Sequence, residues 1–281
     1  MSKVTALQPV DIERPVLDLS GEGLRVILQM MIAGSEDHGG IERYVDAVKL
    51  KSSMFQQALD GGSIDNLDLE TFKGLCTFMA TVRRRIGNWL NEDAFDEMRE
   101  HIKDLFAADI DVDARIDAFC EQFPRDKQHR WVRDLATEML HNADPERVPL
   151  MNRWVWDAKA NTGVIREIWH GDNVDHITIP VGDGYGTYLM LREELSQFLS
   201  DEGVFRDVLQ YVDILCAQVY AQYICEQGGS YLRADFQAPE DPMQHTRRLL
   251  GLDGVHPGNG KTRLKSIDGE AFVLDDSNLL N

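Results

Sequence analysis

The feature that most constrains the fold of this chain is a long apolar stripe with helical spacing at residues 205–226. Its members recur at intervals of three and four positions and share one broad face: Phe205, Val208, Leu209, Val212, Leu215, Cys216, Val219, Tyr220 and Tyr223. This spacing matches the 3.6-residue turn of an α-helix. The pattern therefore predicts a long helix whose apolar face packs against the rest of the protein.

The first half of the chain carries further patterns of the same kind. In residues 68–90, nine apolar side chains fall on one side of a helical wheel: Leu69, Phe72, Leu75, Cys76, Phe78, Met79, Val82, Ile86 and Trp89. Residues 24–32 are apolar on nearly every side, which is typical of a helix buried among others. Suitable N-cap residues precede several expected helices, namely Ser20, Asn91 and Asp111 or Asp113. We expect a helical bundle over residues 20–144, after an irregular arm at 1–19.

The pattern changes after Asp144-Pro145. A short helix is expected at about 148–160, followed by β-branched runs that Gly, Asp and Asn interrupt. These runs predict a three-stranded antiparallel β-meander at about 164–191. The part from 145 to 250 would then pack helices around this meander. An acidic, Gly-rich tail at 251–281 contains one possible hairpin, and the fold class is α+β, mainly α.

Two E-x-x-H sequences raise the possibility of a di-metal carboxylate site. Glu138 and His141 form one pair, and Glu167 and His170 form the other. On a helix this spacing places both side chains on one face, as di-iron sites in helical bundles require. On a strand, residues three apart point to opposite faces, so the second pair could not chelate together. Whether residues 164–170 form a strand or a helix is left open by the sequence.

A second candidate site is the predicted turn at residues 170–176. It brings His170, Asp172, Asp175 and His176 within seven positions. Imidazole and carboxylate ligands suit Zn, Mn or Fe, and the same groups could act as an acid–base pair. The alternative is an ordinary acidic turn, because Asp, Asn and Gly are turn formers. We predict no cofactor here beyond this possible divalent metal.

Tryptophan is concentrated in one stretch of the chain. Trp154, Trp156 and Trp169 lie within sixteen residues, and on the expected 148–160 helix Trp156 projects away from the main apolar face. Such a helix must be covered on two sides, either within its own domain or by another subunit or protein. Because Trp is favoured at protein interfaces, these three residues are the predicted partner-binding residues.

The charge of the chain bears on its function. The 281 residues contain 48 Asp and Glu against 29 Lys and Arg, a formal net charge of -19. This balance disfavours nucleic acids and anionic membranes as partners. No run of about 18 apolar residues and no secretory signal is present, and the four cysteines form no C-x-x-C pair. These features predict a reduced cytoplasmic protein.

No intact catalytic motif is present, so an interaction or accessory protein, such as an adaptor or assembly factor, is the leading prediction. A metal-dependent enzyme using residues 170–176 is the alternative. An acidic DNA mimic that inhibits a nucleic-acid enzyme is a further one. Two basic clusters, Arg83–Arg85 and Arg247-Arg248, stand out against the acidic background. They could bind a carboxylate or phosphate, or pair with neighbouring acidic residues.

Overall fold

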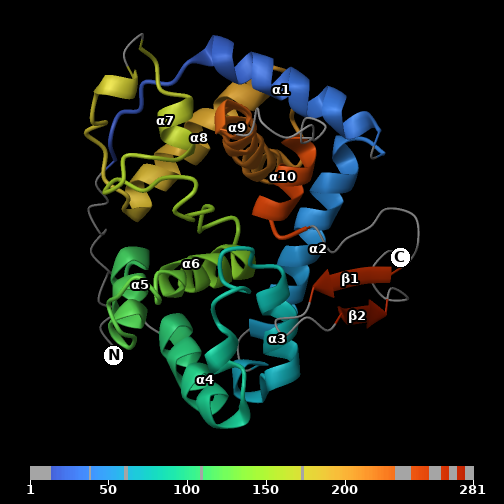
Figure 1. Ribbon diagram of the computed structural model, residues 1–281, viewed down its shortest axis with the longest axis vertical. Coiled ribbons are helices and arrows are strands. Elements are labelled where there is room, and N and C mark those ends of the chain that lie inside the picture. The colour runs from blue at the N-terminus through green and yellow to red at the C-terminus, as the bar shows by residue number, and fades with distance from the viewer. Residues whose placement is uncertain are drawn as a thin grey trace, which may run out of the picture.

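Helix α9 (Val208–Tyr231) lies at the centre of one half of the molecule, with α1, α8 and α10 around it (Figure 1). Every residue from Val212 to Val219 is buried. The middle of the helix is therefore enclosed on all sides, whereas its sequence pattern predicted one apolar face. Phe205 lies before the helix begins and is 76% exposed. Asp207, at the entry to α9, has a positive φ of 56°.

The computed structural model describes residues 14–37, 39–59, 63–107, 110–171, 174–231, 242–252, 261–265 and 271–275. Its remaining α-helices are α1 (Gly21–Glu36), α2 (Ile41–Leu59), α3 (Leu69–Thr77), α4 (Glu92–Ala107), α5 (Val112–Glu121), α6 (Trp131–Ala143), α7 (Val164–Glu167), α8 (Tyr185–Asp201) and α10 (Pro242–Leu249). Short 3-10 helices are η1 (Ser63–Asn66), η2 (Gly87–Trp89) and η3 (Val174–His176). Strands β1 (Lys261–Lys265) and β2 (Ala271–Asp275) pair antiparallel. Among the described residues, every helix is too short or too polar to cross a lipid bilayer.

Helix α2 connects the two halves of the molecule. It packs against α9 in one half and against α6 in the other, where α5 packs on α6 and α4 packs on α5 (Figure 1). Buried apolar residues from Leu17 to Leu252 form one continuous core. The two parts expected on either side of residue 144 therefore share a single hydrophobic core.

The β-meander predicted at 164–191 is wrong. Residues 164–167 form the single turn α7, residues 174–176 form η3, and α8 already begins at Tyr185. Val164, Ile165 and Ile168 are buried against the core. A short buried apolar run is compatible with a strand and with a helical turn, because hydrophobic periodicity does not distinguish the two at this length. The fold between residues 14 and 252 is accordingly helical in its described parts.

The helix predicted at 148–160 is also wrong. This segment forms turns, with Asp157 and Thr162 bridged through their backbones. Pro149 disfavours helical geometry at Val148. The segment runs through the core, where most residues from 148 to 156 are buried. Its two apolar sides are thus covered within the chain itself.

Helix α3 ends at Thr77, well before the end of the predicted helix at 68–90. The chain continues in successive turns that still bury Phe78, Met79, Val82 and Ile86. Gly251, which follows α10 with a φ of +73°, packs directly on the backbone of Phe78. A Cβ atom at position 251 would lie 1.7 Å from the Phe78 carbonyl oxygen, so only glycine fits.

Three predicted N-caps are confirmed. Ser20 Oγ accepts from the backbone N–H of Gly23 at 3.3 Å, Asn91 Oδ1 from Ala94 at 3.1 Å, and Asp111 Oδ1 from Ala114 at 3.0 Å. Residues 24–32 were expected to form a helix buried among others, but α1 buries one face only. Its opposite face is open, and Val26 is 50% exposed.

Candidate functional site

Glu138, a predicted metal ligand, is buried in α6 and is fully engaged by other side chains. Its Oε2 accepts from Lys51 Nζ at 2.7 Å and from Asn142 Nδ2 at 3.2 Å, and its Oε1 accepts from Asn152 Nδ2 at 3.0 Å. Lys51 also donates to the carbonyl oxygen of Leu250 at 3.0 Å. This carboxylate therefore forms a buried ion pair between α2 and α6.

His141, the other half of the motif, has a separate set of partners. Its Nδ1 lies 2.8 Å from the carbonyl oxygen of Val148, and its Nε2 lies 3.2 Å from Asp213 Oδ2. Burial opposes protonation, but the Asp213 carboxylate and these hydrogen bonds outweigh it and raise the pKa of His141. A protonated imidazole supplies both N–H donors. When His141 is protonated, it forms a second buried ion pair with Asp213, between α6 and α9.

The predicted turn site at residues 170–176 is only partly described. His170 and His176 are exposed, Asp172 lies outside the described residues, and the side chain of Asp175 is likewise not described. Among the residues that the structure describes, no three His, Cys, Asp or Glu side chains converge on a possible metal position.

The three predicted partner-binding tryptophans lie mainly inside the protein. Trp156 is fully buried and its Nε1 donates to the carbonyl oxygen of Val181 at 3.1 Å. Trp154 is buried beside Tyr220, with ring centroids 5.9 Å apart. Trp169 is half-buried and its backbone bridges to Leu19. Contacts within the chain account for the packing of all three.

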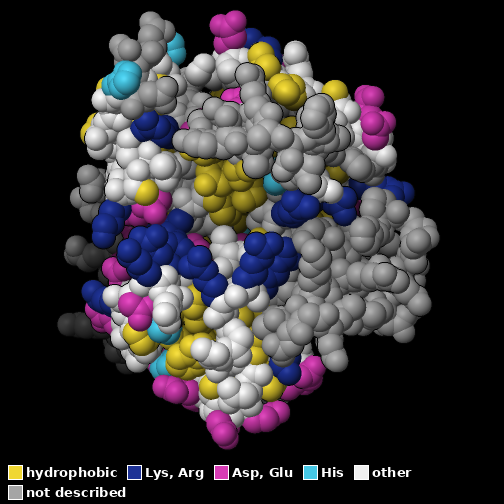
Figure 2. Space-filling model, viewed as in Figure 1, with side chains coloured by type: hydrophobic (Ala, Val, Ile, Leu, Met, Phe, Trp, Pro, Cys, Tyr) yellow, Lys and Arg dark blue, Asp and Glu magenta, His cyan; other side chains and the backbone are white. Residues whose placement is uncertain are grey.

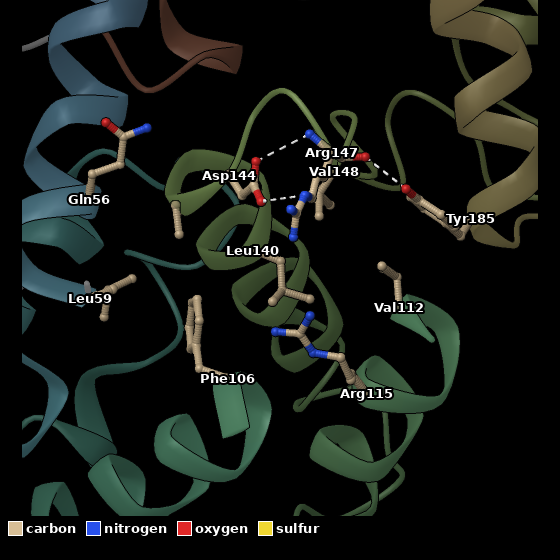
Figure 3. Close-up of a pocket in the computed structure, with 11 residues that line it drawn as sticks. Gln56, Leu59, Phe106, Val112, Arg115, Leu140, Asp144, Arg147, Val148 and Tyr185 are labelled. Carbon is tan, nitrogen blue, oxygen red and sulfur yellow. Dashed lines mark hydrogen bonds and ion pairs between the residues drawn. The ribbon is translucent and has the colours of Figure 1, made fainter. Parts of the chain in front are cut away.

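A pocket of about 580 Å³ lies between α2, α4, α5, the end of α6 and the start of α8 (Figure 3). This volume is within the range of small-molecule sites. Much of the lining is apolar and comes from five segments: Leu59, Phe106, Val112, Leu140 and Val148. The pocket can therefore enclose the hydrocarbon part of a small ligand.

Two arginines extend into this pocket on either side of Leu140 (Figure 3). Arg115 is half-buried on α5, where its Nε donates to the carbonyl oxygen of Leu105 at 2.7 Å and its guanidinium lies 5.9 Å from the Phe106 ring centroid. Burial lowers the pKa of Arg115, yet a guanidinium stays protonated in proteins. Arg115 has no carboxylate within ion-pair distance in the described parts of the chain.

Arg147 forms the second positive group. Its side chain is 85% exposed, and its Nε lies 3.6 Å from Asp144 Oδ2, which is too long for a strong charge-assisted bond. Two arginines against one aspartate leave the pocket lining positive in a chain whose net charge is -19. The pocket thus favours a ligand with negative charge.

Tyr185 closes one side of the pocket and is held at both ends. Its hydroxyl donates to the carbonyl oxygen of Arg147 at 2.8 Å, and its backbone N–H donates to both carboxylate oxygens of Asp113 at 2.9 Å. Gly184 supplies no capping side chain for α8, so Asp113 takes that role from α5. Helix α8 therefore begins within the segment that was expected to form the β-meander.

The pocket wall adjoins the buried His141. The carbonyl of Val148, a lining residue, is the acceptor of His141 Nδ1. The turn from Asp144 to Val148 also closes through backbone bonds to the Asp144 carbonyl. These bonds give the wall a fixed shape. The sequence patterns did not indicate Arg115, Arg147 or Tyr185, because they belong to no motif and meet only in the folded chain.

The segments that carry the two basic clusters noted in the sequence are in contact through Gly251 and Phe78. Gly251, three residues after Arg248, contacts Phe78, and Arg83 Nη1 donates to the carbonyl oxygen of Thr77 at 3.1 Å. Figure 2 shows Lys and Arg side chains in a band across this face, with one group over the start of α6 and another beside the end of α10.

Comparison with models of protein families, with curated proteins and with solved structures finds no match for this chain.

Proposed function

We propose that this chain is a binding protein for a small organic carboxylate with an apolar body. The observation that carries the proposal is the guanidinium of Arg115, half-buried in the pocket between α2, α4, α5 and α6. It forms no direct ion pair among the described residues, lies beside the Phe106 ring, and has Asp144 of the same pocket as the acidic group that acts on its charge. A half-buried cation of this kind is complementary to an anionic ligand group.

The other lining groups define the ligand class more closely. Arginine binds a carboxylate through two parallel hydrogen bonds, and Arg147 adds a second positive charge at the rim. Asp144 opposes a ligand with two negative charges in the same place. Leu59, Phe106 and Val112 would take apolar surface out of water at about 25 cal/mol per Å². A monoanion with an aromatic or aliphatic body therefore fits best.

The proposal predicts that phenylacetate binds and that its affinity depends on the two arginines. We expect Arg147→Gln to weaken binding about threefold or more, since the side chain is exposed, and Arg115→Gln to weaken it about tenfold, the value of one charge-assisted hydrogen bond. Isothermal titration calorimetry measures both. Phenylacetamide, which has the same ring without the charge, should bind more weakly than phenylacetate.

Arg84→Gln is the matched control, because Arg84 is exposed and lies outside the pocket. It should leave phenylacetate affinity unchanged. Thermal melting of each variant checks that Arg115→Gln has not simply unfolded the site. The proposal would be refuted if phenylacetate bound the unmodified protein and the three variants with equal affinity. It would also be refuted if the unmodified protein bound phenylacetamide as tightly as phenylacetate.

The second candidate is a cytoplasmic accessory protein. Its proposed partner-binding surface is formed by exposed arginines and no longer by the three tryptophans. Arg84, Arg85 and Arg248 are exposed and have no ion-pair partner among the described residues. Their two segments meet where Gly251 packs on Phe78. In a chain of net charge -19, such a local basic surface is complementary to an acidic segment of a partner protein. The DNA-mimic role remains a prediction from overall charge.

This candidate predicts salt-sensitive binding of an acidic peptide. A fluorescein-labelled deca-glutamate should bind at low ionic strength, and Arg84→Glu with Arg85→Glu should weaken it about tenfold or more. Fluorescence anisotropy measures the affinity, and Arg147→Gln serves as the control. Unchanged binding in the double variant would rule the surface out, as would tighter binding of a single-stranded DNA oligomer of equal charge.

A further inference from the structure

The pocket that contains Arg115 and Arg147 is called the carboxylate pocket below. A second, smaller pocket lies at the opposite end of α6 from it. Its volume is about 220 Å³, and four arginines line it, Arg125, Arg130, Arg133 and Arg153, together with His129 and Cys120. The volume is below the range of about 300–1,000 Å³ usual for organic ligands. The pocket is therefore suited to a small, strongly charged group.

Two of the four arginines are already paired with carboxylates. Arg153 Nη2 lies 2.9 Å from Asp134 Oδ2, and Arg125 Nη2 lies 3.0 Å from Glu121 Oε1. Asp126, the acidic residue of the lining, accepts from His129 Nδ1 at 2.9 Å. Glu121, Asp126 and Asp134 therefore each have a basic partner in or beside the pocket.

Arg130 and Arg133 are the two arginines of the pocket lining that form no direct ion pair in the described parts of the chain. Arg133 Nη1 donates to the carbonyl oxygen of Met151 at 3.1 Å and Nη2 to that of Asp183 at 2.9 Å, and the carboxylates of Asp183 and Asp134 also attract its charge. These contacts orient its guanidinium, and in the described parts of the chain no carboxylate forms a direct ion pair with it. Arg130 is exposed at the pocket rim and has no ion pair in the described parts of the chain. One arginine is thus held in place and the other is free to close on a ligand.

Cys120 does not compete for this positive charge. Burial raises the pKa of its thiol to about 11, so the group is neutral at physiological pH. A thiolate at this position would repel an anion, whereas a neutral thiol is a small apolar neighbour. Phe123 and Val132 supply further apolar lining.

We propose that this pocket binds a phosphate group, either inorganic phosphate or the phosphate of a small monoester. Arg130 and Arg133 would each donate to phosphate oxygens. A phosphate carries up to two negative charges, which suits the two guanidinium groups that form no direct ion pair. The uncapped start of α6 adds a small favourable potential but does not carry the proposal.

The test is calorimetric titration of the full chain with inorganic phosphate and, separately, with methyl phosphate, at constant ionic strength set by chloride. We expect saturable binding that Arg130→Gln weakens about tenfold. Arg130 is exposed, so this variant should keep its fold, which thermal melting verifies. Tighter binding of methyl phosphate than of phosphate would identify a monoester as the natural ligand group.

Arg147→Gln, in the carboxylate pocket, is the matched control and should bind phosphate like the unmodified protein. Conversely, Arg130→Gln should keep its affinity for phenylacetate, so this proposal and the proposed carboxylate function fail independently. Equal phosphate affinity in Arg130→Gln and the unmodified protein would overturn the phosphate site. Absence of saturable phosphate binding in the unmodified protein would do the same.

Discussion

At the scale of single residues, the two buried ion pairs are the most unusual feature of this protein. Lys51–Glu138 joins α2 to α6, and His141–Asp213 joins α6 to α9. Taking such charges out of water is costly, and only partners of good geometry offset that cost. Here Asn142 and Asn152 provide further hydrogen bonds to Glu138, and the Val148 carbonyl oxygen provides a further hydrogen-bond partner for His141. The pairs therefore tie three helices together at defined positions.

The His141–Asp213 pair predicts a specific pH dependence of stability. The pKa of His141 is raised in the folded protein above its unfolded value of about 6.5. The contribution of His141 to the free energy of unfolding is therefore complete below about pH 6.5. It is lost as the pH rises through the pKa of His141 in the folded protein. We expect Asp213→Asn to be about 1.5–3 kcal/mol less stable at pH 6, the contribution of a hydrogen bond to a charged group.

The stability difference between the unmodified protein and Asp213→Asn should shrink at higher pH, because the imidazole is then neutral in both. Urea unfolding at a series of pH values measures this. Parallel stability curves across the series would show that His141 is not protonated in the folded state. An exposed variant such as Asp117→Asn should leave the pH profile unchanged.

At the scale of elements, α8 depends on a residue of another helix for its N-terminal cap. Gly184 offers no side chain, and both carboxylate oxygens of Asp113 accept the Tyr185 N–H. Burial raises the pKa of Asp113, and the Tyr185 hydrogen bond partly offsets this. The contact connects the start of α5 to the start of α8. It also holds Tyr185 at the side of the carboxylate pocket.

Removal of this cap should cost stability. We expect Asp113→Ala to lower the free energy of unfolding by about 0.5–2 kcal/mol, as for other N-cap replacements. Asp117→Ala, an exposed residue of the same helix, should change it by less than about 0.5 kcal/mol. Urea denaturation compares the two. Equal effects of both replacements would mean that the Asp113–Tyr185 contact contributes little.

At the scale of the whole molecule, α6 separates two positively lined pockets. The pocket at its end is large and mostly apolar, and the one at its start is small and rich in arginine. Both lie in a chain with 48 acidic and 29 basic residues. The two proposed sites place positive charge locally in a chain whose net charge is negative, an arrangement that would attract small anions to these places.

The sequence by itself determined the mainly helical character, several N-caps and most of the core. Leu69, Phe72 and Leu75 are buried as their spacing indicates, and Ser20 and Asp111 cap their helices. These properties depend on neighbours three or four positions away, so a local pattern contains the information. The segment 164–191 was mispredicted because its short apolar runs fit a strand or a helical turn equally well.

The sites were decided by tertiary structure alone. Glu138 and His141 share a motif, but their partners come from Lys51, Asn152 and Asp213, which no local spacing connects. The carboxylate pocket likewise draws Arg115 and Tyr185 from helices seventy residues apart in sequence. A side chain's role in a site depends on what packs beside it after folding, and that arrangement is set by the whole core at once.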